Sequence, residues 1–415
     1  GANRALSSSS NGLEKRPKLR FPGFDDPYRK CRIGDIYGER SQRGAGDMEL
    51  LSVTMNDGVM PRTEIEGKDN SSEDKSNYKV VCKGDMVYNS MRMWQGANGV
   101  SNYDGIVSPA YTVLMPTEEI DNQYFAALFK TSNLINEFRK NSQGLTSDTW
   151  NLKYPQIRPI RLCIPSLQEQ NKISSFIGTL EERISKQRQL VDSLKKYKRG
   201  LSDELFGEKE SCKRWMTVPF SEAFDLLQNN TFSRDEMSTE NGIAYNIHYG
   251  DVLIKYGAVV DLSKSKVPYI RSDVSLSKFA QSSYLRNGDI VIADTAEDYT
   301  VGKAVEIVGV ADTKALSGLH TIPCRPKISF APMYLGYFIN SKRFRTQILP
   351  LAQGTKVSSI SKSEIQKTSI AFPSFEVQSQ IASMLYALDH RIDICQACVQ
   401  GLVRTKEALL QQLFI

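Results

Sequence analysis

Apolar residues follow two long stretches of the chain at alternating steps of four and three. Such spacing is typical of a long helix that buries a narrow seam against a partner helix. Each stretch lasts about 40 residues, or roughly 60 Å of helix, so the sequence predicts two long helices that pair with each other. The seam residues are Ile173, Ile177, Leu180, Ile184, Val191, Leu194, Leu201 and Leu205 in the first stretch, and Ile381, Leu385, Leu388, Ile392, Val399, Leu402, Leu409 and Leu413 in the second.

The second stretch is a copy of the first. Pro165 to Gln170 opens one and Pro373 to Gln378 opens the other, and the two align without a gap, 208 positions apart. Polar residues in a seam cost stability but fix its register, so matching interruptions favour pairing between the copies over two unrelated surface helices that each cover their own domain. The interruptions are Gln187 and Lys198 in the first copy, and Cys395 and Lys406 in the second.

A segment of mixed character precedes each predicted helix. Short β-branched and aromatic runs such as Tyr78–Val81 and Tyr111–Met115 predict strands, and Gln123–Arg139 and Met333–Leu349 each predict an amphipathic helix. The fold class is therefore α+β, with two mixed α/β domains in tandem and two long helices between them. The expected parts are a disordered lead-in at 1–18, domains at 19–163 and 208–371, and helices at 164–207 and 372–415.

Chain order also predicts how the two helices run. The first helix leads from domain one to domain two, so a second helix that pairs along its length must run back. We therefore expect an antiparallel coiled coil with an approximate two-fold axis and the domains at opposite ends.

Composition narrows the class of protein. The chain has 415 residues, enough for two or three domains, and no apolar run approaches the roughly 20 residues that span a bilayer. Seven cysteines without disulfide-framework spacing predict a reducing, cytoplasmic location. A net charge of +6, with a basic cluster at 195–199, suits a polyanionic partner without requiring one.

No motif for catalysis or for a cofactor stands out. The sequence lacks a phosphate-binding glycine loop and a nucleophile elbow, and it has only three histidines. Cys395 and Cys398 form a CxxC inside the predicted second helix, where a buried thiol is far more common than a zinc or redox site. We therefore expect no enzyme activity, no cofactor and no metal.

The duplicated helix opening resembles the specificity subunit of type I restriction-modification systems. The residues that carry the resemblance are Leu19–Phe24, Gly84-Asp85, Gly144 with Thr146, and Pro165–Gln170 followed by Ile173, then Gly288-Asp289, Gly354-Thr355, and Pro373–Gln378 followed by Ile381. The second opening departs from the usual Leu-x-Glu-Gln because it reads Phe375-Glu376-Val377-Gln378.

The resemblance implies a role and a set of partners. Each domain would recognise half of an interrupted sequence in double-stranded DNA, with the helices as a ruler between the half-sites. Two methyltransferase subunits would dock on the chain, restriction subunits would join them, and the catalytic sites would lie in those partners, with no membrane involved. The alternatives are a stand-alone DNA-binding adaptor and a structural coiled-coil scaffold, which a salt titration of DNA binding would separate.

DNA contacts are predicted from loops that carry amides, guanidiniums and aromatic rings, because these groups match base edges whereas lysines mainly hold phosphates. In domain one the candidates are Asn89, Ser90, Arg92, Trp94, Gln95, Gln143, Gly144 and Thr146. In domain two they are His248, Tyr249, Asp294, Thr295, Gln353, Thr355 and Lys356.

Overall fold

The computed structural model describes residues 17–44, 47–55, 58–65, 67, 69, 71–146, 149–207, 215–311, 313–354 and 356–414. It divides into two compact units: unit 1 is Gly1–Gln187 with Cys398–Ile415, and unit 2 is Arg188–Ala397. Each long helix therefore contributes one half to each unit. Most of the predicted lead-in, 1–16, and the start of the predicted second domain, 208–214, lie outside the described residues.

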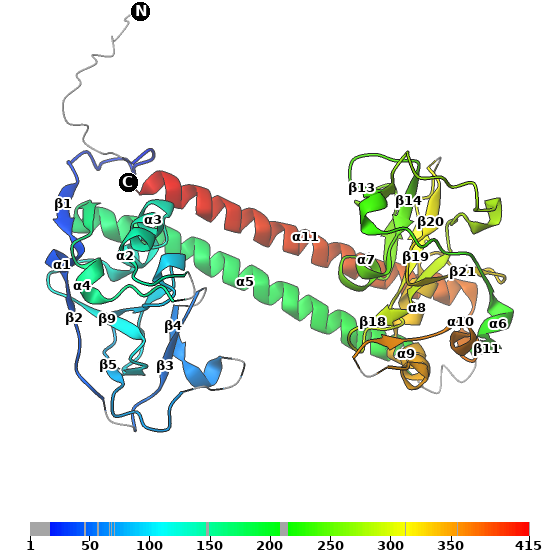
Figure 1. Ribbon diagram of the computed structural model, residues 1–415, viewed down its shortest axis with the longest axis horizontal. Coiled ribbons are helices and arrows are strands. Elements are labelled where there is room, and N and C mark those ends of the chain that lie inside the picture. Colours follow the sequence, from blue (N-terminus) through cyan, green and yellow to red (C-terminus); the bar gives the residue numbers. More distant parts are fainter. Residues whose placement is uncertain are drawn as a thin grey trace, which may run out of the picture. The chain divides into compact units, whose positions relative to one another are not determined.

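Unit 1 contains a mixed domain in which every named strand pair is antiparallel. Its strands are β1 Arg29–Arg32, β2 Tyr37–Glu39, β3 Leu51–Thr54, β4 Gly58–Pro61, β5 Lys79–Val81, β6 Met86–Asn89, β7 Asn98–Val100, β8 Gly105–Val107, β9 Tyr111–Pro116 and β10 Arg161–Ile164. Its helices are α1 Ile33–Ile36, α2 Asn122–Leu128, α3 Ser132–Asn141 and α4 Tyr154–Ile157, followed by α5 Leu167–Phe206. The main sheet has the order β2-β9-β6-β7, and β1 pairs with β10 where the domain meets α5 (Figure 1).

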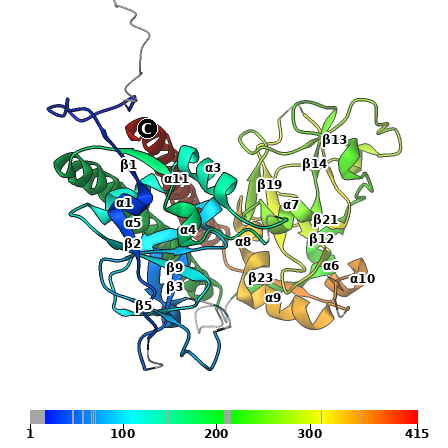
Figure 2. The same cartoon turned by 60° about the vertical axis from the view of Figure 1, so that its left-hand side comes forward.

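Unit 2 repeats this plan with larger sheets. Its strands are β11 Met216–Pro219, β12 Phe224–Leu226, β13 Met237–Ser238, β14 Ala244–Ile247, β15 Val259–Asp261, β16 Tyr269–Ile270, β17 Ile290–Ala293, β18 Thr295–Ala296, β19 Ala304–Val308, β20 Ala315–Ser317, β21 Thr321–Pro326, β22 Ser358–Ser359 and β23 Ser369–Phe372. Its helices are α6 Phe220–Ala223, α7 Tyr249–Ile254, α8 Tyr334–Asn340, α9 Lys342–Ile348, α10 Lys362–Ile365 and α11 Phe375–Leu413. The sheets have the orders β12-β21-β17-β19-β15 and β13-β16-β14-β20. Figure 2 shows β23, α9 and α10 together at one end of the unit, with β13 and β14 toward the other.

The fold class predicted from the sequence is confirmed, but the two amphipathic helices are each broken in two. Gln123–Arg139 is divided between α2 and α3, and Met333–Leu349 between α8 and α9. The same feature causes both breaks: the hydroxyls of Thr131 and Ser341 donate to the carbonyls of Leu128 (2.8 Å) and Phe338 (2.6 Å). A hydroxyl that bonds the preceding turn, on a residue with extended backbone, ends one helix and starts the next.

The long helices pack into the core of both units. In unit 1 the first half of α5 lies beside the last half of α11 (Figure 1), and Ile173 and Ile177 share a buried cluster with Leu410 and Leu413. In unit 2 the roles are exchanged, because the end of α5 and the start of α11 enter one cluster that contains Phe206. Within each unit the helix halves therefore run antiparallel. All the predicted seam residues are buried or half-buried.

Two of the four predicted interruptions of the seam, Lys198 and Lys406, form ion pairs. Lys406 pairs with Glu181 at 2.8 Å in unit 1, and Lys198 pairs with Asp389 in unit 2. Lys198 matches Lys406 and Glu181 matches Asp389 in the 208-residue repeat. Because the residue numbers of the two pairs have the same sum, both fit one antiparallel register.

A glutamine holds the start of each long helix against its own domain. Gln170 donates to the carbonyl of Pro165 (3.0 Å) and accepts from the backbone N–H of Asp121 (3.1 Å) at the start of α2. Gln378, its equivalent, donates to the carbonyl of Pro373 (2.9 Å) and accepts from the N–H of Ala331 (2.9 Å) before α8. The repeated Pro-Ser-x-x-x-Gln opening therefore fixes where each helix leaves its domain.

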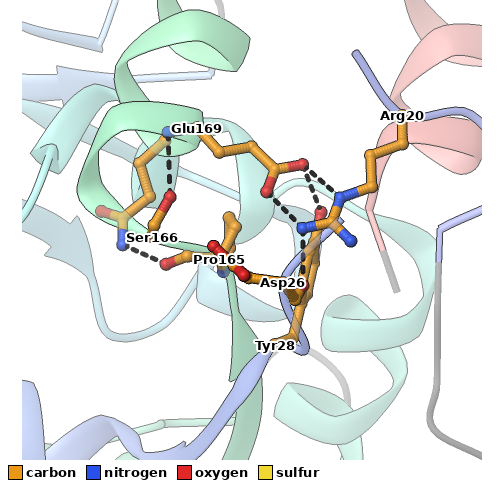
Figure 3. Close-up of polar contacts among 7 residues, drawn as sticks. Arg20, Asp26, Tyr28, Pro165, Ser166 and Glu169 are labelled. Carbon is orange, nitrogen blue, oxygen red and sulfur yellow. Dashed lines mark hydrogen bonds and ion pairs between the residues drawn. The ribbon is translucent and has the colours of Figure 1, made fainter. Parts of the chain in front are cut away.

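Unit 1 adds an ion pair at this point (Figure 3). The buried Glu169 accepts two hydrogen bonds from Arg20, at 2.9 and 2.8 Å, and a third from the Tyr28 hydroxyl at 3.2 Å. Arg20 also donates to the carbonyl of Asp26 at 2.7 Å. The segment before β1 is thereby joined to the first turn of α5, and the N–H of Leu19 bonds the carbonyl of Gln412 near the end of α11 (2.9 Å).

The repeated Gly-Asp pairs have a structural role. Asp85 is buried and accepts from Arg40 (2.7 Å) and from the N–H of Cys82 (2.8 Å). Asp289 likewise accepts from Arg325 (2.6 Å) and from the N–H of Arg286 (2.7 Å). Each carboxylate closes the turn before a central strand and neutralises a guanidinium.

Candidate nucleic-acid interface

Two loops of unit 1 that contain the candidate residues meet in space. The carbonyl of Ser90, just after β6, accepts from the N–H of Leu152 at 2.8 Å. Gln143 and Asn151 exchange two backbone hydrogen bonds, which close the loop between them. Gly144 has a φ of +141°, where a Cβ would lie 2.6 Å from the carbonyl oxygen of Thr149, so the turn requires glycine.

Aromatic rings join the two loops. Trp94 packs edge-to-face against Trp150 with the ring centroids 5.2 Å apart, and the guanidinium of Arg139 lies 5.5 Å from the Trp94 ring. The indole N–H of Trp94 donates to the carbonyl of Met91 at 3.0 Å. This arrangement presents a half-buried aromatic ring and a cation next to the exposed Arg92, a combination suited to base edges and phosphates.

Unit 2 builds its candidate loops on the same backbone frame. The carbonyl of Asp294, the equivalent of Ser90, accepts from the N–H of Ile360 at 2.8 Å. Gln353 and Ser359 exchange the two hydrogen bonds that Gln143 and Asn151 exchange in unit 1. Strand β18 adds a pairing to β22 beside them, with Thr295 opposite Ser359. Candidates far apart in sequence are thus held in one cluster in each unit.

Polar and aromatic groups differ between these frames. In unit 2 the ring of Tyr249 lies 4.6 Å from that of His248 and 5.2 Å from that of His320. His320 Nδ1 is 3.5 Å from the carboxylate of Asp294, which also accepts from the hydroxyl of Thr295 at 2.7 Å. This group offers a carboxylate, a hydroxyl, an imidazole and a phenol within one patch.

Burial separates contact residues from supporting ones. The hydroxyl of Ser90 is buried against that of Thr112 (2.8 Å), so this residue supports the loop from below. His248 is also buried; its Nδ1 accepts from the N–H of Gly250 (3.2 Å). Burial, then the nearby Arg234, lowers the pKa of His248 to about 4, which keeps the imidazole neutral at pH 7.

The other candidates lie at or near the surface. Arg92, Gln143, Gly144, Thr146, Gln353 and Lys356 are exposed, and Asn89, Trp94, Gln95, Tyr249, Asp294 and Thr295 are half-buried. Asn89 accepts from the N–H of Met91 at 3.0 Å. Thr355 lies outside the described residues.

Sequence reasoning missed three residues of these clusters. Trp150 follows a polar loop and carries no local signal of its partner Trp94, and Arg139 lies in the last turn of α3 as an ordinary helical cation. His320 has a φ of +54°, unusual for a residue other than glycine, and its place beside Asp294 depends on the turn before β21.

Two features that would indicate other functions are absent from the described part of the chain. Its residues include no group of three or more histidine, cysteine, aspartate or glutamate side chains that could hold a metal ion. None of its helices is long and apolar enough to cross a membrane.

Comparison with known families decides the class of the chain. A model of the type I restriction modification DNA specificity domain matches residues 32–195 and again residues 213–400. The chain belongs to this family. Its role is recognition of DNA sequence within a type I restriction-modification system, and the family acts by recognition rather than catalysis.

Solved structures from type I restriction-modification systems share the fold of this chain. One is the crystal structure of a type I restriction-modification system S subunit from M. genitalium, with 13% identity and a TM-score of 0.56, covering 97% of this chain and 99% of that one. Another comes from work on complex assembly and conformational transition of the type I system, with 15% identity, a TM-score of 0.56, and coverage of 95% and 99%. Both matches cover both units of this chain. The two solved structures therefore share its tandem fold.

Proposed function

We propose that the chain reads a bipartite target in double-stranded DNA, with one half-site for each mixed domain. The domains are 19–163 and 208–371, and the helices at 164–207 and 372–415 set the distance between half-sites. The observation that supports this most is the repeated loop frame, in which two equivalent sets of backbone hydrogen bonds hold different polar side chains. Equal frames with unequal side chains suit two recognition sites with different base preferences.

In this proposal the exposed members of each cluster make the base contacts. Arg92 and Gln143 would read the half-site of unit 1, since a guanidinium suits guanine and an amide suits adenine. Tyr249, Thr295 and the pair of Asp294 with His320 would read that of unit 2. Ser90 and His248 would position these groups, because both are buried.

We further propose that the chain docks two methyltransferase subunits and, through the complex, restriction subunits, and that it works in the cytoplasm without a cofactor of its own. Catalysis would belong to the partners. Support for two docking positions comes from Phe176 on α5 and Met384 on α11, which are equivalent in the repeat and are 38% and 48% exposed. Exposed large apolar residues at matching positions suit two copies of one partner.

The experiment that tests bipartite reading uses one variant per unit. The double variant Arg92→Ala/Gln143→Ala should lower discrimination roughly tenfold to hundredfold at base pairs of one half-site only. Thr295→Ala/His320→Ala should do the same at the other half-site only. The measurement is competition binding by the chain with its methyltransferase partner, against DNA in which each base pair is replaced in turn.

The controls are variants of exposed residues outside both clusters, such as Glu222→Gln in unit 2 and Lys83→Gln in unit 1. Loss of discrimination in both half-sites from a single-unit variant would contradict the assignment of one half-site per domain. For docking, native mass measurement should give two methyltransferase subunits per chain, and a stable one-to-one complex in excess partner would refute that stoichiometry.

A further inference from the structure

A pocket of about 530 Å³ in unit 2 collects positive charge. It lies between the second half of α5, the loop after β18, and helices α8 and α9. Six of its lining residues are basic: Lys195, Lys198, Arg199, Lys303, Lys342 and Arg345. Only Asp203 and Asp389 are acidic, so the lining has an excess of four positive charges.

Three of the cations have their positions fixed by the protein. Lys198 pairs with Asp389, while the ammonium of Lys303 donates to the carbonyls of Leu253 (2.8 Å) and Tyr256 (2.9 Å). Arg345 donates to the carbonyl of Val301 at 3.0 Å. Carbonyl oxygens orient a cation without placing a negative charge beside it, so Lys303 and Arg345 contribute positive charge to a partly buried lining. Burial, and then repulsion from Lys198 and Arg345, lowers the pKa of Lys303.

The other three cations are available for a ligand. Lys195, Arg199 and Lys342 have exposed side chains, and among the residues that the structure describes none of them has an ion-pair partner. Lys195 and Arg199 are one helical turn apart on α5, and Lys342 begins α9. An anion in this pocket would meet cations from two elements at once.

The internal repeat distinguishes scaffold cations from additional ones. Lys198 has the equivalent Lys406 in unit 1, and both form the ion pair between the helices. The other five cations are absent at the equivalent positions of unit 1, which are Val403 for Lys195, Glu407 for Arg199, Ala97 for Lys303, Ser132 for Lys342 and Ile135 for Arg345. The scaffold that the two units share therefore forms in unit 1 without these five cations.

A pocket of about 340 Å³ in unit 1 lies on the first half of α5 and on α2, and its charged lining residues are Lys130, Asp121 and Glu181. None of the five equivalent positions lines this pocket. The excess of positive charge is therefore not repeated at the equivalent positions of unit 1, which favours a ligand that unit 2 alone binds.

The basic pocket is continuous with the reading loop of unit 2. Tyr299 and Thr300 line it and lie a few residues after Asp294 and Thr295. Arg345 bonds the backbone of this same loop at Val301. If the bases of a DNA strand met the Asp294 cluster, the neighbouring phosphates of that strand would be directed toward the pocket.

We propose that this pocket binds backbone phosphate of the DNA beside the half-site read by unit 2, and that unit 1 lacks such a contact. The inference rests on the proposed reading of DNA by the Asp294 cluster. An acidic patch of a partner protein would also suit a cationic pocket, but continuity with the reading loop favours the nucleic acid. Phosphate contacts position a protein on the duplex and add affinity without sequence preference.

The test compares two triple variants with the same change in net charge. The first is Lys195→Gln/Arg199→Gln/Lys342→Gln. The control is Lys196→Gln/Lys266→Gln/Lys362→Gln, which removes exposed cations of unit 2 that do not line the pocket. Each full chain, assembled with its methyltransferase partner, is titrated with cognate and unrelated duplex DNA at several salt concentrations. Circular dichroism and melting confirm that the variants are folded.

The pocket variant should show a log–log salt dependence that is less steep by about 2 to 3, at about 0.9 for each lost phosphate contact. Its affinity should fall by a similar factor for cognate and unrelated DNA, while the control stays within about 1 of the unaltered chain. A pocket variant with the control's slope overturns the proposal, and so does a variant that binds DNA normally but loses methyltransferase affinity. If the unaltered chain shows no salt-dependent DNA binding, the proposed function itself fails, and that outcome is distinct from the others.

Discussion

Unit 1 and unit 2 hold the start of their long helices with the same glutamine, yet unit 1 places beside it an ion pair that has no counterpart among the described residues of unit 2. In unit 1 Glu169 is buried and satisfied by Arg20 and Tyr28. The equivalent residue of unit 2 is Val377, which is 39% exposed. A carboxylate can be buried in unit 1 because the segment before β1 supplies its partners, and unit 2 instead has an uncharged side chain at this position.

The two units also differ in how they cap the helix that contacts this glutamine, which is α2 in unit 1 and α8 in unit 2. In unit 1 Asp121 caps α2 locally, since its side chain accepts from the N–H groups of Gln123 and Tyr124. Unit 2 has Ala331 at the matching position, and the N–H groups around the start of α8 donate to the buried Glu306 of β19, at 2.5 Å from Met333 and 2.9 Å from Gly336.

These exchanges show which interactions the duplicated scaffold requires. The glutamine bonds, the loop frame and the ion pairs between the helices occur in both units, whereas isolated charges are moved or removed. Neutral hydrogen bonds to backbone groups depend only on the shared chain path. A buried charge also needs a specific partner or cap, so it changes more freely between copies that have diverged.

The largest expected effect comes from changing the helices that the units share. In the antiparallel register of the two ion pairs, the residue numbers of paired positions have a constant sum. The same sum pairs Gln189 with Cys398 and Leu190 with Ala397, so the Gln189–Leu190 and Ala397–Cys398 peptide bonds are matched insertion points. One heptad inserted at each bond keeps both seams in register and adds about 10 Å, close to three base-pair steps. The original target should be lost, and any new target should have the same half-sites further apart. Methylation mapping decides this, and an unaltered spacer would show that the helices are not the ruler.

A heptad inserted in only one of the two helices tests the antiparallel register directly. A heptad in α5 alone shifts one helix against the other by two turns, so the Lys198–Asp389 and Lys406–Glu181 pairs cannot both form. Folding or assembly should then fail, whereas the double insertion should melt like the unaltered chain. Equal melting of the single and double insertions would contradict a fixed antiparallel register.

Much of this fold could be predicted from the sequence, because its main signals are local or repeated. The seam spacing, the duplicated Pro-Ser-x-x-x-Gln opening and the two polar levels predicted the long helices and their pairing. The breaks at Thr131 and Ser341 were missed because a hydroxyl in an amphipathic pattern carries no sign of which carbonyl it will bond. Glu306 gave no sign of capping α8, since the cap depends on a strand and a helix that meet only in the fold.

The candidate site was less predictable for the same reason. Composition directed attention to loops with amides and aromatics, and the structure brings those loops together in each unit. Trp150 and Arg139 join Trp94 from other elements, and the basic pocket draws its cations from three separate segments. Such groupings follow from tertiary contacts, so the individual DNA contacts stay predictions.

The buried Glu306 that caps α8 predicts how the stability of unit 2 depends on pH. The dependence should be opposite in sign to that of a carboxylate held in an ion pair, which stabilises the fold as pH rises. Burial raises the pKa of Glu306 to about 7 from its ordinary 4.5, so between these pH values the folded state holds a proton that the unfolded state has released. The stability of unit 2 should therefore fall as pH rises from 4.5 to 7, by up to about 3 kcal/mol. Glu306→Gln should remove this slope, while the exposed Glu297→Gln keeps it. Hydrogen exchange of the α8 amides, measured across this pH range, reports the stability of unit 2. The same dependence of stability on pH in both variants would refute the prediction.

The ion pair at the start of α5 predicts a smaller loss confined to unit 1. Arg20→Met leaves the carboxylate of Glu169 buried with only the Tyr28 hydroxyl and should cost about 2 kcal/mol, less than a fully buried pair because Arg20 keeps 16% of its side chain exposed. Adding Glu169→Gln should recover most of that loss, since no charge then lacks a partner. In unit 2, Val377→Glu should change stability by less than about 0.5 kcal/mol because the site is open to water. Hydrogen exchange in the first turns of α5 and α11 compares them, and no recovery in the double variant would argue against a buried charge as the cause.

The smallest expected difference lies between the two equivalent ion pairs of the helices. Glu181 is 49% exposed, so the Lys406–Glu181 pair meets water, whereas Asp389 is 27% exposed and also accepts from the hydroxyl of Tyr337 at 2.8 Å. The ring of Tyr337 lies 5.3 Å from the ammonium of Lys198, which adds a cation–π contact.

Double-mutant cycles with Lys→Met and the matching amide should give a coupling of about 0.3 kcal/mol in unit 1 and about 1 kcal/mol in unit 2. Raising the salt concentration should weaken the first coupling more than the second, because an exposed pair is screened and a half-buried one is protected. Equal couplings with equal salt dependence would show that burial at Asp389 contributes nothing, and that the two pairs are equivalent in energy as well as in position.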